Sequence, residues 1–194
     1  MLPPGRLYDA HERCASLTGA CLLAAAIAYP ANVPEQQIRP LIVRETARAV
    51  LINREDRVLL FESVLNGRTF WVAPGGGLQE GETHEQAVVR ELWEETGVQD
   101  ATIGPRVWDR RHVFDIGEIR LDQRERYFLV RIDMHEVSTA NFEEHEVTFH
   151  IAHRWWSLAE MAASTERLVP RDFARLLAPL LAGDIPAEPI TVGR

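Results

Sequence analysis

The sequence predicts a single α/β domain in which helices cover both faces of a mixed β-sheet. Three observations favour this fold class. The chain has 194 residues, enough for one well-packed domain, and hydrophobic residues make up 46% of it. Strand-like segments lie on both sides of one strong central helix. A further amphipathic helix follows near the end of the chain, so helices are available for both faces of the sheet.

Composition divides the chain into three parts. In residues 1–40, prolines bracket an alanine-rich stretch at 14–28. That stretch resembles a signal peptide, but Asp9 and Glu12 interrupt the positive region that a signal peptide needs. No segment is apolar over enough residues to predict a membrane span, so we expect no membrane partner. We predict an N-terminal extension over residues 1–40, a folded domain over 41–185, and a loose tail over 186–194.

Charge and cysteine content narrow the function classes. The formal net charge is −8, from 29 acidic and 21 basic residues, so the chain is not built to hold long nucleic acid by charge. An anionic substrate would need a few local arginines or bound cations. Cys14 and Cys21 fit no metal-ligand pattern and are too few for a disulfide scaffold. Unpaired thiols indicate a reducing compartment, and we expect a cytoplasmic protein.

The first predicted strands lead to a glycine-rich loop. Apolar runs at residues 46–52 and 58–61 predict two strands, separated by a polar turn at 53–56. Asn66-Gly67 is a strong turn signal before a short aromatic strand at 69–72. Residues 74–77 read Pro-Gly-Gly-Gly and are predicted to form a loop.

Cap signals define the central helix, predicted over residues 83–96. Thr83 and Gln86 form a capping box at its start, and Gly97 ends it. Downstream we expect strands at 106–114, 124–133 and 148–156, with an acidic loop at 135–146. A short helix is expected at 158–163, capped by Ser157 and Glu160. A further helix is expected at 170–182, with a kink near Pro179. From Gly183 onward the proline-rich chain is expected to be loose.

The central helix carries a cluster of glutamates that needs a chemical reason. Glu91, Glu94 and Glu95 stand at i, i+3 and i+4, so they share one stripe and repel one another. A divalent cation removes that repulsion, and Mg²⁺ prefers oxygen ligands. We expect Val88, Val89 and Leu92 to anchor the opposite face of the helix in the core.

The glycine loop and two flanking residues complete a candidate phosphate site. Without side chains, the three glycines let a phosphate or metal approach closely, and their carbonyls are further hard ligands. The following helix N-terminus favours anions. Arg90 is expected to hydrogen-bond Glu82 or to orient the carboxylates.

The string GGLQEGETHEQAVVRELWEETGV, Gly76 to Val98, resembles the Nudix box in its MutT-like form, with every fixed position filled. The resemblance implies a Nudix α/β/α sandwich and hydrolysis of a nucleoside diphosphate linked to another group, with Mg²⁺ or Mn²⁺ as the cofactor. It implies Glu91 and Glu95 as the main metal ligands, Glu94 as an assisting ligand, and the Gly75 carbonyl as another. Arg90 and Glu82 would orient the carboxylates. Gln79 departs from the acid that relatives often carry, which makes the site slightly less acidic.

The general base is left open between several glutamates. In relatives it is a glutamate of the box, here Glu94, or one from a distant loop. Glu143, Glu144 and Glu146 lie in the acidic loop, where a catalytic residue could be mobile, and we favour Glu146. Glu125 is another candidate, because the strand that carries it could turn it toward the substrate; it could equally pair with Arg124 or Arg131 on the surface.

Substrate contacts are predicted from arginines, glycines and an aromatic residue. Strand alternation sends Arg110, Arg111 and His112 to opposite faces, so at most two of them can face the site. Trp93, at the free position of the box, either covers the sheet or forms a homodimer contact. The predicted substrate-binding residues are Arg44, Trp71, Gly76, Gly77, Arg111 and Glu125.

Two other functions compete with a hydrolase. A non-catalytic nucleotide-sensing module would have lost Glu91 or Glu95, and both are present. An isomerase of prenyl diphosphates would call for a cysteine near the site, and Cys14 and Cys21 lie far upstream. Oxidised nucleoside triphosphates, ADP-ribose, dinucleoside polyphosphates and nucleotide sugars all remain open as substrates.

Overall fold

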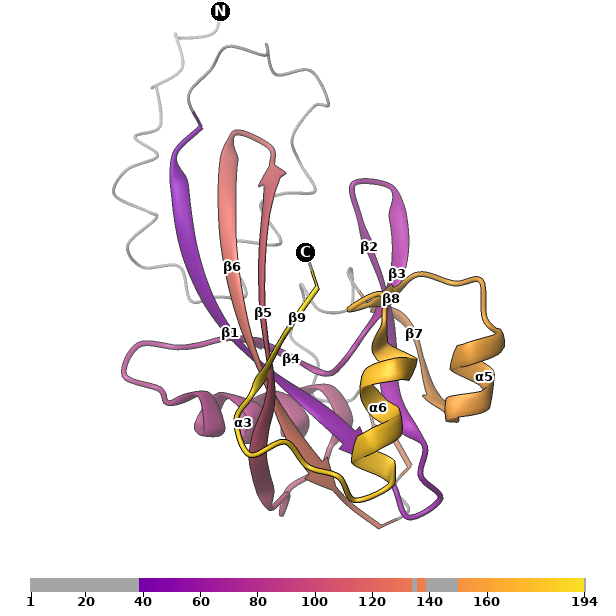
Figure 1. Ribbon diagram of the computed structural model, residues 1–194. Coiled ribbons are helices and arrows are strands. Elements are labelled where there is room, and N and C mark those ends of the chain that lie inside the picture. Colours follow the sequence, from indigo (N-terminus) through magenta and orange to yellow (C-terminus); the bar gives the residue numbers. More distant parts are fainter. Residues whose placement is uncertain (1–38, 134–135, 139–149, 194) are drawn as a thin grey trace, which may run out of the picture.

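The computed structural model describes residues 39–133, 136–138 and 150–193 (Figure 1). No helix in this part of the chain is long and apolar enough to cross a membrane. Its elements, in chain order, are β1 (Leu41–Ile52), β2 (Val58–Leu65), β3 (Arg68–Val72), β4 (Gly75–Gly77), α3 (His84–Thr96), β5 (Ile103–Ile116), β6 (Ile119–Arg131), β7 (His150–Trp156), α5 (Leu158–Ala163), β8 (Leu168–Val169), α6 (Phe173–Leu181) and β9 (Ile190–Val192).

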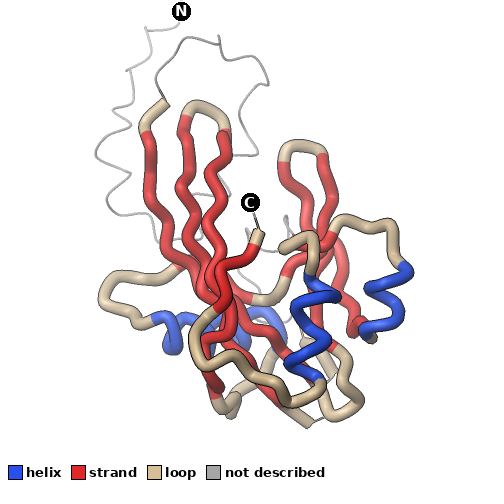
Figure 2. The backbone as a smooth tube through the Cα atoms, in the orientation of Figure 1, coloured by secondary structure: helices blue, strands red, loops and turns tan. Residues whose placement is uncertain are grey.

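The strands form one mixed sheet, as the sequence predicts. The order along the sheet is β8-β3-β2-β1-β6-β5-β9, with β4 paired to β1 and β7 paired to β2. The central pair β1 and β6 runs parallel from Leu41↔Arg120 to Ile52↔Arg131, while β5 and β6 form a long antiparallel hairpin. Figure 2 shows these three strands extending together beyond the helices. The parallel pairing places side chains about eighty positions apart in the sequence side by side on one face.

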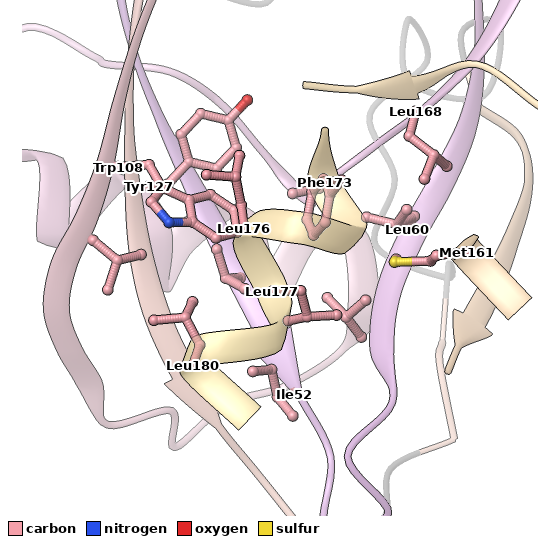
Figure 3. Packing of buried hydrophobic residues seen from close by; sticks show 14 of the residues in the cluster. Ile52, Leu60, Trp108, Tyr127, Met161, Leu168, Phe173, Leu176, Leu177 and Leu180 are labelled. Carbon is pink, nitrogen blue, oxygen red and sulfur yellow. The ribbon is translucent and has the colours of Figure 1, made fainter. Parts of the chain in front are cut away.

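Helices cover both faces of the sheet, so the α/β/α sandwich is confirmed. On one face, Ala87, Val88 and Leu92 of α3 pack with Ala47 and Leu51 of β1. On the other face, α6 lies against the sheet, and its Phe173 meets Trp108 edge to face with ring centroids 5.4 Å apart (Figure 3). The central strands therefore bury side chains on both faces, which explains their nearly continuous apolar runs.

Local cap signals fix where two helices begin. Thr83 accepts from the Gln86 amide while the Gln86 side chain accepts from the Thr83 amide, and Ser157 and Glu160 make the same pair of bonds. Gly97 ends α3 with a φ of 77°, a conformation that suits glycine. Both capping boxes predicted from the sequence are present.

Several element boundaries differ from the prediction. The Pro-Gly-Gly-Gly segment is not entirely loop, because Gly75–Gly77 pair with β1 as β4. The last helix begins at Phe173 rather than Pro170. The expected loose tail is wrong for Ile190–Val192, which pair with β5 as β9 and bury Val192. These strands depend on partners distant in sequence, which local patterns do not reveal.

Candidate active site

Helix α3 presents two of its glutamates to the protein interior. Glu91 and Glu95 are only 5% and 2% exposed and lie on the same side of the helix as the apolar residues Val88 and Leu92. The expectation that these glutamates stand opposite the core-facing side is therefore wrong. Val89, expected in the core, is exposed. Burying a carboxylate is costly without compensating contacts, so such placement indicates a specific role.

The glycine segment provides the contacts that this burial requires. The Gly75 amide donates a 2.7 Å hydrogen bond to Oε2 of Glu95. A Cβ atom at Gly76 would come closer to the Glu91 carboxylate than the 3.0 Å that real Cβ atoms keep from other heavy atoms. Gly75 and Gly76 thus form a backbone cradle for the two carboxylates, and only glycine leaves room for it.

Arg90 links three carboxylates on the outer side of the same site. Its Nε donates to Oε1 of Glu82 at 2.9 Å, and its Nη1 donates to Glu91 and Glu94 at 2.9 and 2.8 Å. Its Nη2 reaches the carbonyl of Gly77 at 2.9 Å. Although partial burial disfavours the charged form, the hydrogen bonds from Arg90 and the Gln79 amide hold the pKa of Glu82 below its usual value. The expected contact between Arg90 and Glu82 is present, and it orients Glu91 and Glu94 as well.

Glu125 on β6 is held by donors from three strands. Its Oε1 accepts from Nε of Arg48 at 3.3 Å and Nε2 of Gln123 at 2.8 Å. Its Oε2 accepts from Nη1 of Arg110 at 2.6 Å and the Tyr127 hydroxyl at 3.2 Å. Burial opposes ionisation, but the charges of Arg48 and Arg110 lower the pKa of Glu125 below its usual value. Glu125 therefore stays ionised and serves as a counter-ion inside the sheet.

Arg44 on β1 is a buried arginine close enough to Glu91 and Glu125 to feel their charges. It is 6% exposed, and its buried Nε finds no hydrogen-bond partner among the described residues. Burial, with repulsion from Arg48, lowers the pKa of Arg44 to about 10, while the charges of Glu91 and Glu125 oppose this shift. A buried guanidinium N–H group without a partner costs stability, and an anionic ligand would supply a missing acceptor. The Nε atoms of Arg106 and Arg110 on β5 are also buried without a hydrogen-bond partner in the described part of the chain.

The donor set fits a hard divalent cation that keeps other ligands. Glu91 and Glu95 offer carboxylate oxygens beside backbone carbonyls, which suits Mg²⁺. In the described part of the chain, no three histidine, cysteine or acidic side chains are gathered closely enough to hold an ion by themselves. The remaining coordination positions would fall to water and substrate oxygens, which is usual for Mg²⁺.

The other residues predicted for the site lie in varied places. Trp71 is 7% exposed and belongs to the core under α6, and its indole N–H donates to Glu166. The Arg111 side chain is 64% exposed and pairs with Asp122 at 2.6 Å. Glu143, Glu144 and Glu146 lie outside the described residues.

Arg48 is a site residue that the sequence analysis missed. Strand alternation gives the signal that could have found it. Arg44 and Arg48 are four positions apart in a strand, hence on one face, with the polar Thr46 between them on that face.

Replacing Gly76 by Ala tests the glycine cradle. We expect the new methyl group to push the Glu91 carboxylate away, lowering kcat/KM by about tenfold or more, with a cost in the free energy of unfolding of about 1 kcal/mol. Gly67→Ala is the matched control, because Gly67 has a φ of +69° but open space around it. The control should lose a similar free energy through backbone strain and keep full activity. Full activity of Gly76→Ala would contradict the cradle.

A family model described as the NUDIX domain matches residues 43–177. The chain is 31% identical over 157 residues to an RNA pyrophosphohydrolase of Aeromonas hydrophila, which covers 74% of this chain and 88% of the relative. It is 33% identical over 129 residues to an RNA pyrophosphohydrolase of Sphingopyxis alaskensis, covering 61% of this chain and 80% of the relative.

Solved structures show the same fold. A MutT protein from Methanosarcina mazei superposes with a TM-score of 0.51 at 22% identity, covering 75% of this chain and 99% of that one. An Ap4A hydrolase from C. elegans superposes with a TM-score of 0.52 at 19% identity, covering 72% of this chain and 98% of that one. At these identities the likeness concerns the fold alone.

Proposed function

Because this chain belongs to the Nudix family, whose domain spans residues 43–177, we propose that it cleaves a diphosphate linkage in a nucleoside diphosphate derivative with the help of Mg²⁺ or Mn²⁺. The chain is a hydrolase that acts on diphosphate bonds. The observation that carries the metal-dependent mechanism is the burial of the Glu91 and Glu95 carboxylates against the backbone of Gly75 and Gly76.

The reaction breaks one phosphorus–oxygen bond and forms another. A water molecule attacks a phosphorus atom, its proton passes to a base, and the bridging oxygen leaves with the second phosphoryl group. The products are a nucleotide and either phosphate or a phosphorylated compound. When bound, the cation would neutralise the diphosphate and lower the pKa of the attacking water.

The residues of this chain would hold the cation, position its ligands and contact the phosphate groups. Glu91 and Glu95 supply charged oxygens for the cation, with Glu94 and the Gly75 carbonyl as further donors. Arg90, fixed by Glu82, keeps Glu91 and Glu94 in position. Arg44, with its unpartnered Nε, would hydrogen-bond a phosphate oxygen, and the Gly76 and Gly77 backbone would line the phosphate path.

The proton acceptor remains a proposal between Glu146 and Glu94. Glu125 is poorly suited, because four donors already occupy its two oxygens. Glu94 is half-buried and held by Arg90. We favour Glu146, which can be tested directly by Glu146→Gln, with Glu94→Gln alongside it. Glu146→Gln should lose kcat while keeping Mn²⁺ affinity, whereas Glu94→Gln should also lower Mn²⁺ affinity, because Glu94 is proposed as a further donor to the cation.

A substrate panel with Mg²⁺ and Mn²⁺ tests the proposed reaction. It should contain an oxidised nucleoside triphosphate, ADP-ribose, a dinucleoside polyphosphate, a nucleotide sugar and a short RNA with a 5′-triphosphate. The RNA is included because the relative from Aeromonas hydrophila is named an RNA pyrophosphohydrolase. We expect metal-dependent release of phosphate or nucleotide from at least one compound. Binding of a nucleotide without any turnover across the panel would instead favour the non-catalytic sensing module.

A further inference from the structure

The guanidinium of Arg48 connects the sheet to the backbone that holds Glu95. Its Nη1 donates to the carbonyl of Ala73 at 3.1 Å and to the carbonyl of Gly75, and its Nε pairs with Glu125. Gly75 in turn donates its amide to Glu95. Contacts thus run without interruption from Glu125 on β6, through Arg48 on β1 and Gly75 on β4, to Glu95 on α3.

We propose that Arg48 is a positioning residue of the metal centre, holding the Ala73 and Gly75 carbonyls so that the Gly75 amide stays aimed at Glu95. This inference rests on the proposed function, because it assigns to Arg48 the orientation of a group that would bind the cation. In this role Arg48 acts through Gly75, whose carbonyl is also proposed as a donor to the cation. Substitution of a residue that orients a metal ligand typically lowers metal affinity or activity by about 10- to 100-fold.

Gly75 needs this support because of its backbone conformation. Its φ is +129°, and a Cβ atom there would overlap the carbonyl oxygen of Ala47 on β1. Only glycine fits so close to β1, and glycine alone does not hold one conformation. The Pro74–Gly75 peptide group carries the Gly75 N–H, and its Pro74 carbonyl accepts from the Ala49 amide at 2.8 Å. Arg48 holds the two flanking peptide groups, Ala73–Pro74 and Gly75–Gly76, so the direction of the Gly75 N–H bond is restricted from both sides.

Glu125 stabilises the positive charge of the buried Arg48 side chain. Desolvation is the largest influence and disfavours the charged form of Arg48, but the interactions with Glu125, Tyr127, Glu95 and Glu91 together outweigh it and raise the pKa of Arg48. Arg110 also pairs with Glu125, at 2.6 Å. If Arg48 is removed, Glu125 therefore keeps a cationic partner, which makes substitution of Arg48 tolerable for folding.

Mn²⁺ affinity of the free protein, measured by electron paramagnetic resonance, tests the role of Arg48 without relying on turnover. Arg48→Lys keeps the charge but replaces the planar fork with a compact ammonium group, and Arg48→Met removes the charge. We expect Mn²⁺ affinity to fall at least about tenfold in both variants. Arg120→Lys is the matched control, since Arg120 pairs with Asp115 on an exposed part of the sheet, and it should leave Mn²⁺ affinity unchanged.

Hydrogen exchange of the Gly75 amide, followed by nuclear magnetic resonance, separates positioning from simple support of the fold. We expect faster exchange of this amide in Arg48→Lys while Tm shifts by only a few degrees. A lower Tm with unchanged Mn²⁺ affinity and unchanged Gly75 exchange would overturn the inference.

Glu95→Gln distinguishes failure of the inference from failure of the proposed metal site. If Glu95→Gln loses Mn²⁺ affinity and Arg48→Lys does not, the metal site stands and the role of Arg48 is wrong. If neither variant changes Mn²⁺ affinity, the proposed metal site fails. In that case the proposed role of Arg48 in metal binding fails too, even if hydrogen exchange of the Gly75 amide changes in Arg48→Lys.

Discussion

Glu95→Gln is expected to lower kcat/KM on the best diphosphate substrate by about 10²–10³-fold while the protein stays folded. Glu95 is buried, and its carboxylate accepts the Gly75 amide. Glutamine has the same shape, and its amide oxygen can still accept that hydrogen bond. What the substitution removes is the negative charge that a divalent cation needs.

Steady-state kinetics over a range of Mg²⁺ and Mn²⁺ concentrations checks this expectation, with circular dichroism to confirm the fold. Partial rescue at high Mn²⁺ concentration should distinguish weaker metal binding from loss of a base. Glu85→Gln is the matched control, because Glu85 is an exposed glutamate in the first turn of the same helix. Glu95→Gln with wild-type turnover would show that the cation, or the reaction, lies elsewhere.

Arg44→Met is expected to weaken catalysis and to stabilise the protein at the same time. A hydrogen bond to a charged group contributes about 1.5–3 kcal/mol, so loss of a phosphate contact should raise KM or lower kcat/KM by about 10- to 100-fold. Methionine fills a similar volume but carries no charge. It therefore removes a buried cation whose Nε has no hydrogen-bond partner among the described residues and which Arg48 repels. Tm should therefore rise by a few degrees, corresponding to about 1 kcal/mol.

Thermal unfolding and kinetics on the same preparations test both halves of this prediction. Arg124→Met serves as the control, since Arg124 is an exposed arginine of the neighbouring strand whose partners are Glu45 and Asp122. The control should leave activity and Tm nearly unchanged, because Arg124 is exposed and the buried Asp122 keeps its shorter ion pair with Arg111. A lower Tm with unchanged kinetics in Arg44→Met would show that Arg44 supports the fold and does not bind substrate.

Some of the candidate site was predictable from the sequence because it is local. The segment from Gly76 to Val98 contains its own helix caps, glycines and glutamates, and helix periodicity places Glu91 and Glu95 on one side. Arg90 reaches Glu82, Glu91 and Glu94 within the same segment. The mixed sheet with helices on both faces also followed from the alternation of strand and helix signals.

The remaining part of the site depends on pairing between distant strands. The register Arg48↔Tyr127 between β1 and β6 decides that Arg48 lies beside Glu125, and β5 brings Arg110 to the same carboxylate. Sequence patterns left Glu125 open between base, substrate contact and surface residue, because strand alternation gives a face but not its neighbours. They also placed Trp71 near the substrate, whereas it packs in the core.

By itself, the sequence determined the family, the glutamate-bearing helix and its caps, since these rest on contacts within a few turns of one segment. Only the tertiary structure decided which arginines of β1 are satisfied. Arg48 is held by Glu125 and two carbonyls, and the Nε of Arg44 is left without a partner. The physical reason is that burial and hydrogen-bond satisfaction are properties of the packed sheet, which no local pattern encodes.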